Sequence, residues 1–572
     1  MKILGICHDV LICSACLIEN GEIRMAISEE RLDRRKQSRI FPERAIARCL
    51  LESGLGWEDI DEVAIAWNPA IDAETTPGGF LDSRRWRAEH LMQVPSRMLR
   101  MAGQKAGNWT QQRDLWEGAP PITYVEHYLA HLGNAVFLSP YEECAVLVLD
   151  GRAEKMTGLL GTARGAHLEI LEEMEFPHSL GLLYGAVTQF LGFRPDSDEW
   201  KVMALAAFSE GDNPFLEKMR SLIRVDARGR LRLSLEELAF YNFWDSRMYS
   251  DEFVDLFGEP RQKNAPLEAC HKQIAAALQT VFEEVVTRIL EILHQRTGMD
   301  KVVVTGGCFM NSAFNGKITQ VSPFLECFIT SCPDDSGTSV GAALYLHALR
   351  MGQRPPEAPL HNFWGPGFSD AECWEAVQKA KLPGARILEN PAQQAARDLN
   401  DGKLLGWFQG RAEFGQRALG GRSILADPRR GEMKDIVNAA VKFREGFRPF
   451  APAILAERVA DYFQCEPDTR VAFMERVLPF RPEKIQEVPA VAHEDGTGRV
   501  QTVDGNSPAR YREVLVEFEK LTGVPVVLNT SFNLNGEPMV NSPEDAIRTF
   551  YSCGLDILYL GNVRITKSPS DA

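Results

Sequence analysis

A stretch of arginines among glycines occupies residues 410–429 and reads GRAEFGQRALGGRSILADPR. It concentrates positive charge in a chain whose formal net charge is −16, through Arg411, Arg417, Arg422 and Arg429. Guanidinium groups pair bidentately with phosphate oxygens, and glycine lets backbone N–H groups approach them closely. A surface turn with scattered salt bridges would also explain this stretch taken alone. The residue types favour a pocket for polyanionic phosphates.

More basic and polar residues follow in VKFREGFRPFAP, VAHEDGTGRVQTVD and NTSFN, and the last of these comes directly after the apolar residues 524–528. Amide and hydroxyl groups at the end of a buried strand are typical ligand-facing positions in α/β proteins. We therefore predict a single site for polyanionic phosphates, formed by Arg417, Lys442, Arg444, Arg448, His493, Arg499, Asn529, Ser531 and Asn533.

A second kind of chemistry is indicated by two histidines in YVEHYLAHLGNAVF, His127 and His131. Four-residue spacing on a helix places both imidazoles on one face, although a lone pair of this kind is more often two ordinary histidines. Asp150 and Asp335 each follow a run of apolar strand residues, where a carboxylate is costly unless it meets a cation or hydrogen-bond donors. Two imidazoles and two carboxylates suit Fe(II), Mn(II) or Zn(II), with coordination positions left open for substrate.

A glycine-containing turn follows the predicted strand 301–305 and reads GGCFMNSAFNGK. A strand that ends in such a turn and opens a helix presents backbone donors to a phosphate or an adenylate. We predict nucleotide contacts from Gly306, Gly307, Asn311 and Asn315.

The elements that must position these residues are strands and helices in alternation. Short strands at residues 3–6, 13–18 and 23–27 surround an Asn-Gly turn, which is a strong hairpin signal. The same unit recurs at residues 145–149, 157–162 and 168–171, and a long amphipathic helix is predicted at 267–294. Two copies of one layout indicate an internal duplication of the actin/hexokinase/Hsp70 type, whose halves close over a nucleotide.

Composition limits the domain organisation and the partners. The length of 572 residues allows two or three domains, and the proline-rich residues 355–359 separate a domain at 1–355 from one at 356–572. The acidic balance argues against nucleic acid as a partner, and apolar runs fall short of the roughly 20 residues that span a bilayer. The cysteines stand mostly in apolar contexts, which fits reduced thiols in a cytoplasmic protein.

The motifs EFG-RALG-RSILADPR, VK-RE-FRPFAP, H-DGT-RVQTV and LNTSFN-GEP occur in order over some two hundred residues. In these four motifs and their order, the chain resembles the O-carbamoyltransferases of the nodulation, cephamycin and tobramycin type. The resemblance implies an α/β chain with an N-terminal duplicated Kae1-like domain, followed by an α+β YrdC-like domain. It also implies that carbamoyl phosphate and ATP, with Mg²⁺, form carbamoyl-adenylate in the second domain. The carbamoyl group then passes to a hydroxyl of a small molecule in the first domain.

The resemblance further assigns His127, His131, Asp150 and Asp335 to a divalent metal, with Fe(II) favoured, although Asp334 is adjacent to Asp335 in the sequence. Lys36 and Lys201 are expected to contact the adenylate or carbamoyl group, while solvated lysines remain an equal alternative. His8 and Asp9 are expected near the reacting hydroxyl. They stand three positions earlier than the His-Asp pair of relatives, so the general base stays open.

Two alternative functions stay open. A tRNA threonylcarbamoylation enzyme would combine both folds, but the chain shows no basic stripe. A nucleotide-binding regulator could retain the fold without catalysis. The acceptor loops, including residues 68–109, carry no readable code for the acceptor, and a homodimer is the default expectation for the assembly.

Overall fold

The structure is a computed structural model that describes residues 1–8, 10–68, 109–111, 119–242, 246–443 and 448–568. It divides into two compact units. The first unit is Met1–Arg24 with Arg39–Ala358, and the second is Met25–Ser38 with Pro359–Ala572. Residues 25–38 therefore group with the second unit, although the predicted boundary placed them in the first. The predicted site residues Asp9 and Arg444 and the loop at 69–108 lie outside the described residues.

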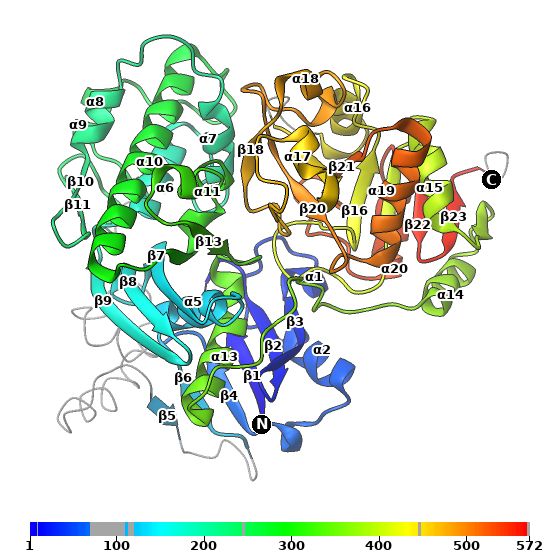
Figure 1. The fold of residues 1–572 in the computed structure, drawn as a ribbon, viewed down its shortest axis with the longest axis horizontal. Helices are drawn as coiled ribbons and strands as arrows, with labels where there is room; N and C mark the ends of the chain where they lie inside the picture. Colours follow the sequence, from blue (N-terminus) through cyan, green and yellow to red (C-terminus); the bar gives the residue numbers. More distant parts are fainter. Residues whose placement is uncertain (9, 69–108, 112–118, 243–245, 444–447, 569–572) are drawn as a thin grey trace. The chain divides into compact units, whose positions relative to one another are not determined.

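Two mixed sheets of similar design lie in the first unit (Figure 1), apart from residues 25–28 of β3, which belong to the segment grouped with the second unit. One sheet has the order β3-β2-β1-β4-β6-β5, formed by Glu22–Ser28, Ser14–Glu19, Lys2–Cys7, Glu62–Ile65, Ile122–Tyr124 and Trp109–Gln111. The other has the order β13-β12-β7-β8-β9, formed by Glu326–Ile329, Lys301–Thr305, Glu143–Ala153, Met156–Arg164 and His167–Glu175. In the first sheet β1 pairs antiparallel with β2 and parallel with β4. In the second sheet β7 pairs in the same way with β8 and β12. The predicted duplication and the actin/hexokinase-like fold are confirmed.

Two helices lie between these sheets. Helix α13 (Thr338–Met351) packs on β1, β2 and β4, helix α5 (His127–Val136) packs on β7 and β12, and the two helices pack on each other (Figure 1). A Cβ at Gly341 would lie 1.7 Å from the carbonyl oxygen of Ala130 in α5. The close crossing of α5 and α13 therefore requires a glycine at this position.

Other helices cover the outer faces of the two sheets. Helix α2 (Glu43–Ser53) packs on β2, while α6 (Leu180–Phe190) and α10 (Ala269–Thr297) pack on β7. The apolar positions of α10, spaced by three and four residues, join β7 and β12 in one core, which explains the predicted amphipathic helix. Shorter elements complete the unit: η1 (Trp57–Asp59), α7 (Glu199–Ala206), α8 (Leu216–Ser221), β10 (Ile223–Val225), β11 (Leu231–Leu233), α9 (Asp251–Phe257), η2 (Gly307–Met310), α11 (Ser312–Asn315), α12 (Ile318–Val321) and η3 (Asp335–Gly337).

The second unit is an α+β unit with one large mixed sheet. Its order is β14-β23-β22-β15-β16-β21-β17-β20, formed by Ala385–Ile387, Val563–Thr566, Ile557–Leu560, Leu405–Phe408, Arg422–Ala426, Val526–Ser531, Ala451–Leu455 and Gln501–Val503. Helices α19 (Ala509–Thr522) and α15 (Pro391–Asn400) pack together, and α19 contacts β17 and β21. Helices α14 (Asp370–Ala380) and α20 (Pro543–Tyr551) both contact β22.

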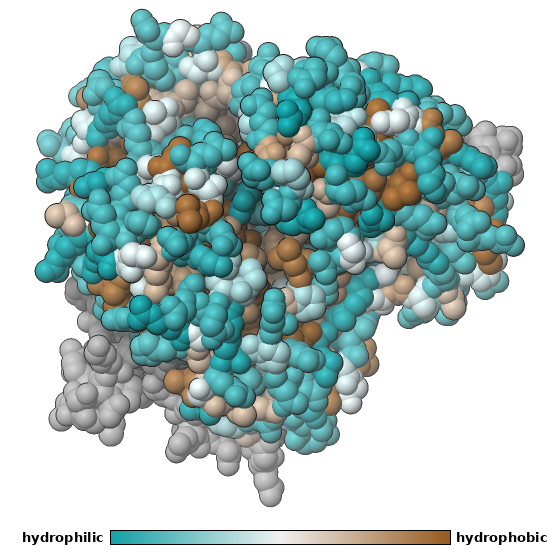
Figure 2. Space-filling model, viewed as in Figure 1, coloured by the Kyte–Doolittle hydropathy of each residue, from teal (hydrophilic) through white to brown (hydrophobic). Residues whose placement is uncertain are grey.

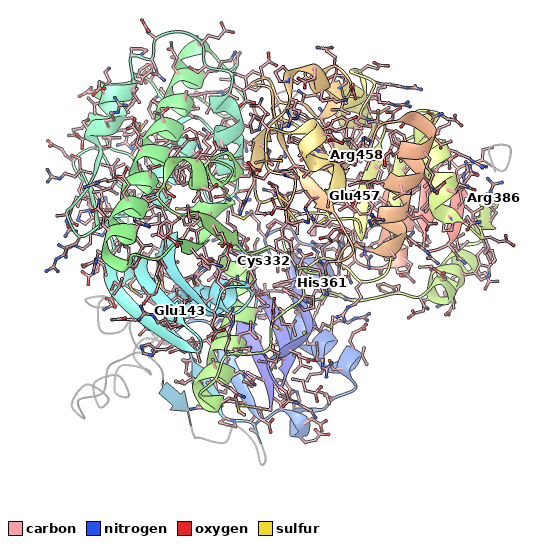
Figure 3. The ribbon with its side chains drawn as sticks, viewed as in Figure 1. Glu143, Cys332, His361, Arg386, Glu457 and Arg458 are labelled. Carbon is pink, nitrogen blue, oxygen red and sulfur yellow. The ribbon has the colours of Figure 1, made fainter. Side chains whose placement is uncertain are left out.

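The remaining elements of the second unit are short. They are α1 (Glu30–Asp33), α16 (Met433–Val437), the π-helical turn η4 (Asn438–Lys442), η5 (Ala456–Arg458), α17 (Val459–Tyr462), β18 (Val477–Pro479), α18 (Pro482–Ile485), η6 (Pro489–Val491) and β19 (Thr497–Arg499). In η5, Glu457 is exposed and Arg458 is half-buried; both are labelled in Figure 3. There Arg458 pairs with Asp461 at 2.7 Å.

The predicted strand at 524–528 is shifted in the structure. Strand β21 runs from Val526 to Ser531, so Asn529 and Ser531 lie inside it and pair with Leu425 and Ser423 of β16. The polar side chains were predicted to follow the strand, but the ladder with β16 extends the strand through them.

Among the described residues, every helix is too short or too polar to cross a bilayer. The face drawn in Figure 2 is mostly hydrophilic, with small scattered hydrophobic patches.

Candidate metal centre and anion site

Three elements of the first unit bring the predicted metal ligands together. Helix α5 carries His127 at its first position and His131 one turn later. Asp150 projects from β7 just before the register of β7 and β8 shifts, and Asp335 opens the turn η3 that leads into α13. Asp334, the adjacent alternative, instead accepts a hydrogen bond from the Ser336 hydroxyl at 2.7 Å. The structure therefore selects Asp335 as the fourth member of the cluster.

The ligand atoms of these four residues lie within 4.8 Å of one another. The two Nε2 atoms are 2.9 Å apart. Asp335 Oδ1 lies 3.3 Å from His127 Nε2, and Asp150 Oδ2 lies 3.4 Å from His131 Nε2. An ion about 2.1 Å from each ligand atom needs ligand separations of about 3.0–3.4 Å. The cluster fits a single divalent ion.

Neighbouring groups orient the ligands. The carbonyl oxygen of Ala66 lies 3.3 Å from His127 Nδ1, and a proton on Nδ1 leaves the Nε2 lone pair facing the cluster. The Gly307 N–H donates to Asp150 Oδ1 at 2.9 Å. Asn134 of α5 donates to the carbonyl of Cys332, which is labelled in Figure 3 and lies three residues before Asp335. Each ligand-bearing segment is thus tied to another part of the unit.

The charges inside this cluster are strongly coupled. Burial lowers the pKa of His127, but hydrogen bonds and charges from Asp150 and Asp335 outweigh burial and raise it to about 10. Burial raises the pKa of Asp150, yet the two imidazoles hold it well below its ordinary value. Two buried carboxylates this close require compensation by protons or by a cation. A divalent ion that binds here must displace imidazole protons.

A buried glutamate that the sequence did not single out supports the same helix. Glu154 accepts hydrogen bonds from the backbone N–H of Asn68 at 2.6 Å and of His127 at 3.2 Å. Burial raises the pKa of Glu154 to about 8, although the N–H group of Asn68 and the charge of His127 oppose the rise. The only sequence signal was an acid four residues after Asp150.

The predicted nucleotide turn lies beside the metal cluster. Gly306 has φ +96°, and a Cβ there would meet the Leu149 carbonyl at 2.1 Å, so glycine is required. The Asn311 side chain exchanges hydrogen bonds with Gln279 of α10, and Asn315 donates to the Phe309 carbonyl at 2.7 Å. These two amides hold the shape of the turn.

His8 and Lys201 are the other described residues predicted for a site in this unit. His8 follows Cys7, whose thiol donates to the Asp335 carbonyl at 3.2 Å, and the His8 ring lies 5.5 Å from the Phe41 ring. Lys201 Nζ lies 3.3 Å from Asp198. Asp196, which the sequence did not single out, has its pKa raised by burial. Arg39 lowers that pKa, and the charges of Asp335 and Asp150 raise it further.

In the second unit, the contacts of Arg411, Arg422 and Arg429 at 410–429 are to protein groups. Arg422 is fully buried and donates to the carbonyls of Gln409, Gly421, Pro366 and Gly410. Arg411 donates to the carbonyls of Gly365 and Trp364, and Arg429 pairs with Asp427 at 2.7 Å. Arg411, Arg422 and Arg429 thus help to hold the loop, and phosphate binding by this stretch stays a prediction.

The backbone donors of this loop are also engaged. Glu413 Oε1 accepts hydrogen bonds from the N–H groups of Leu419, Gly421 and Arg422 at 2.7–3.1 Å. The Gly420 N–H donates to the Ser423 hydroxyl. These N–H groups therefore already donate to a carboxylate of the protein itself. Arg417, at the half-buried tip of the loop, remains the predicted ligand from this stretch.

Three predicted anion-site residues do come together at the end of β21. Lys442 Nζ donates to the Ser531 carbonyl at 2.6 Å and to Asn533 Oδ1 at 2.8 Å. Asn529 donates to the Ala418 carbonyl and to Gln501, and its Oδ1 is buried with no hydrogen-bond partner within the described ranges.

One ring nitrogen of His493 has a hydrogen-bond partner, and the other has none among the described residues. Its Nδ1 lies 3.0 Å from the Thr497 hydroxyl, while Nε2 is buried and unpartnered among the residues that the structure describes. Burial lowers the pKa of His493 to about 4; Asp495 opposes this, and Arg499 and Lys434 lower it further. Arg448 and Arg499 are both half-buried.

The segment Met25–Ser38 adds arginines to the second unit that the sequence placed elsewhere. Arg31 is buried and donates to the Gly415 carbonyl at 2.9 Å, two residues before Arg417. Arg34 donates to the carbonyls of Met539 and Pro538. Lys36 is exposed in this segment and therefore belongs to the second unit, not to the unit that holds the metal cluster.

Known proteins share both parts of this chain. A family model described as carbamoyltransferase N-terminus matches residues 2–344, and one described as carbamoyltransferase C-terminus matches residues 396–567. The nodulation protein NolNO of Sinorhizobium fredii is 35% identical over 98% of this chain and 80% of its own length. Nodulation protein U of Rhizobium tropici is 30% identical over 94% of this chain and 91% of its own. Among solved structures, T. kodakarensis HypF aligns with 61% of this chain and 48% of its own, at 10% identity and a TM-score of 0.31.

Proposed function

Because the chain belongs to the carbamoyltransferase family, we propose that it is an ATP-dependent O-carbamoyltransferase with one partial reaction in each unit. The second unit forms carbamoyl-adenylate, and the first unit transfers the carbamoyl group to a hydroxyl of a small molecule. The matches to both family models, over residues 2–344 and 396–567, carry this proposal.

The first partial reaction needs cations around phosphates. Carbamoyl phosphate, ATP and one water give carbamoyl-adenylate, phosphate and pyrophosphate. Fixed positive charge stabilises the anions that develop in such phosphoryl transfers. We assign this role to Arg417, Arg448, Arg499 and the Lys442 ammonium, with Mg²⁺ accompanying ATP. His493 Nε2 and Asn529 Oδ1 are buried polar atoms that a bound substrate could satisfy.

The second partial reaction is assigned to the first unit. An acceptor hydroxyl attacks the carbamoyl carbon and releases AMP, so a carbamate ester forms. A divalent ion held by His127, His131, Asp150 and Asp335 would supply positive charge for the adenylate phosphate. The imidazoles and carboxylates provide the ordered ligand set for this ion, and the turn at Gly306 and Gly307 lies beside Asp150. His8, close to the Asp335 main chain through Cys7, is the proposed residue near the acceptor hydroxyl.

A coupled assay for pyrophosphate tests the first step. The wild-type protein should release pyrophosphate from ATP only when carbamoyl phosphate is present. A protein that binds nucleotide as a regulator should release none, and that result would refute the enzyme proposal.

Variants of the second unit sharpen this test. Arg417→Ala or Arg448→Ala should lower carbamoyl-phosphate-dependent pyrophosphate release at least 100-fold, because each removes a cation from the phosphates. The control is Arg411→Ala, whose side chain contacts the Gly365 and Trp364 carbonyls and should retain most of the activity. Equal losses in all three variants would refute the role of Arg417 and Arg448 as ligands.

A further inference from the structure

The buried carboxylate of Glu154 lies at the edge of the proposed metal centre without being one of its ligands. Its side chain is 1% exposed and follows β7, the strand that carries Asp150. The residue has φ +50°, a conformation that costs a non-glycine residue on the order of 1 kcal/mol. Burying a carboxylate adds a further cost unless donors surround it. Two unfavourable features at one residue indicate that its position matters.

Both backbone N–H groups that donate to the Glu154 carboxylate help to place one proposed metal ligand, His127. Its Oε1 accepts directly from the His127 N–H at 3.2 Å. The same oxygen accepts from the Asn68 N–H at 2.6 Å. Asn68 lies two residues after Ala66, whose carbonyl contacts His127 Nδ1 at 3.3 Å. The carboxylate therefore holds both the main chain of His127 and the segment that orients its imidazole.

Glu154 also provides a hydrogen-bond acceptor for the N-terminus of helix α5, which its own N-cap side chain does not provide. The N-cap residue of α5, Glu126, makes no capping side-chain bond among the described residues, and the first N–H groups of a helix need partners. A carboxylate near a helix N-terminus also interacts favourably with the helix dipole. Because Glu154 and Asp150 share one strand and turn, this contact ties the helix with two histidines to the strand with one carboxylate.

We propose that Glu154 is a positioning residue for the metal centre: it fixes His127 relative to Asp150 through backbone hydrogen bonds and does not touch the ion. The inference rests on the proposed metal centre and deepens it. Groups that orient metal ligands typically change metal affinity about 10–100-fold when removed. A residue that only stabilises the fold would leave the affinity of the folded protein unchanged.

Titration of the full-length protein with Co(II), followed by ligand-field absorption and calorimetry, separates these possibilities. Glu154→Ala should weaken Co(II) binding at least 10-fold and alter the absorption bands, because His127 loses its anchor. Glu154→Gln should bind within about threefold of wild type, since glutamine retains one oxygen that can accept from both N–H donors as Oε1 does, and only the longer 3.4 Å contact of the His127 N–H with Oε2 is lost. Glu154→Asp, one methylene shorter, should behave like the alanine variant, and it provides a second test should the alanine variant fail to fold.

Glu413 provides a matched control in the second unit. It is 3% exposed and also accepts backbone N–H donors, so its removal costs similar stability. Glu413→Ala should leave the Co(II) affinity and spectrum unchanged. Wild-type affinity and spectrum in Glu154→Asp, or equal weakening in Glu413→Ala, would overturn the role of Glu154. A wild-type protein that binds no Co(II) would overturn the metal centre itself. None of these readouts depends on carbamoyl phosphate, so they are distinct from failure of the proposed reaction.

Discussion

At the scale of single residues, the two sites differ in how their polar groups are satisfied. In the first unit, four side chains face one another and require a cation or protons between them. In the second unit, Arg411, Arg422 and Lys442 already donate to carbonyls, and the buried His493 Nε2 has no partner among the described residues. The first site is arranged around a positive charge, and the second around a few buried polar atoms.

The His493 imidazole makes the stability of the protein sensitive to acid. Its pKa is about 4 in the folded protein, chiefly through burial, and about 6.5 when unfolded. The unfolded chain therefore binds more protons between these values, so stability is retained above pH 6.5 and falls as the pH drops toward 4. The loss should be at most about 3 kcal/mol, because each pKa unit corresponds to about 1.4 kcal/mol and the ring is half-buried.

Urea unfolding at pH 7 and pH 4.5 should show this effect. Wild type should lose more unfolding free energy between the two pH values than His493→Gln, by about 2 kcal/mol. Parallel losses in the two proteins would contradict the low pKa of His493.

The clustering of the four proposed metal ligands was easier to predict from the sequence than the contacts of the arginines. His127 and His131 could be predicted because helical spacing is local, and Asp150 and Asp335 because acids after apolar strands are conspicuous. The arginines at 410–429 could not be sorted, because charge in a sequence does not reveal whether its donors meet carbonyls. Glu154 was missed for a related reason: its partner Asn68 lies 86 residues away in the chain.

At the scale of elements, the crossing of α5 and α13 sets the position of both histidines. Gly341 of α13 approaches the Ala130 carbonyl of α5, one residue before His131. The sequence showed a helix of small residues near Ser339 but not which residue must be small, because the contact joins distant segments.

Gly341→Ala should push the two helices apart. Overpacking of this kind costs about 1–3 kcal/mol, and movement of His131 should also weaken Co(II) binding. Thermal unfolding and Co(II) titration would measure both effects. Gly505→Ala is the control, because a Cβ there meets nothing within 4 Å. If Gly341→Ala matched this control in both measurements, the crossing would not set the ligand geometry.

The segment Met25–Ser38 is an element that no sequence pattern assigned to the second unit. Arg31 holds the Gly415 carbonyl next to the predicted ligand Arg417. Arg31→Met should therefore lower carbamoyl-phosphate-dependent pyrophosphate release at least 10-fold and leave Co(II) binding unchanged. The exposed neighbour Arg35 gives the control variant Arg35→Met, which should retain wild-type pyrophosphate release. Unchanged release in Arg31→Met would show that the loop does not depend on this contact.

At the scale of the whole molecule, two units of different architecture make up one polypeptide. The duplicated strand pattern of the first unit was predictable because hairpins and alternating apolar runs are local signals. The second unit was predictable as α+β only through its family resemblance, since its sheet pairs strands far apart in sequence, such as β14 with β23 and β16 with β21. The grouping of Met25–Ser38 with the second unit could not be predicted from the proline-rich residues 355–359. Those residues mark only one of the places where the chain passes from one unit to the other.

The central claim is that the two units perform successive partial reactions, and His131→Ala tests it most directly. The measurement follows pyrophosphate release and carbamoylation of a hydroxyl acceptor, identified by a mass gain of one carbamoyl group, in the same reaction mixture. His131→Ala should release pyrophosphate at the wild-type rate when ATP and carbamoyl phosphate are present, but should form no carbamoylated product. Equal loss of both activities would contradict the division of the reaction between the two units.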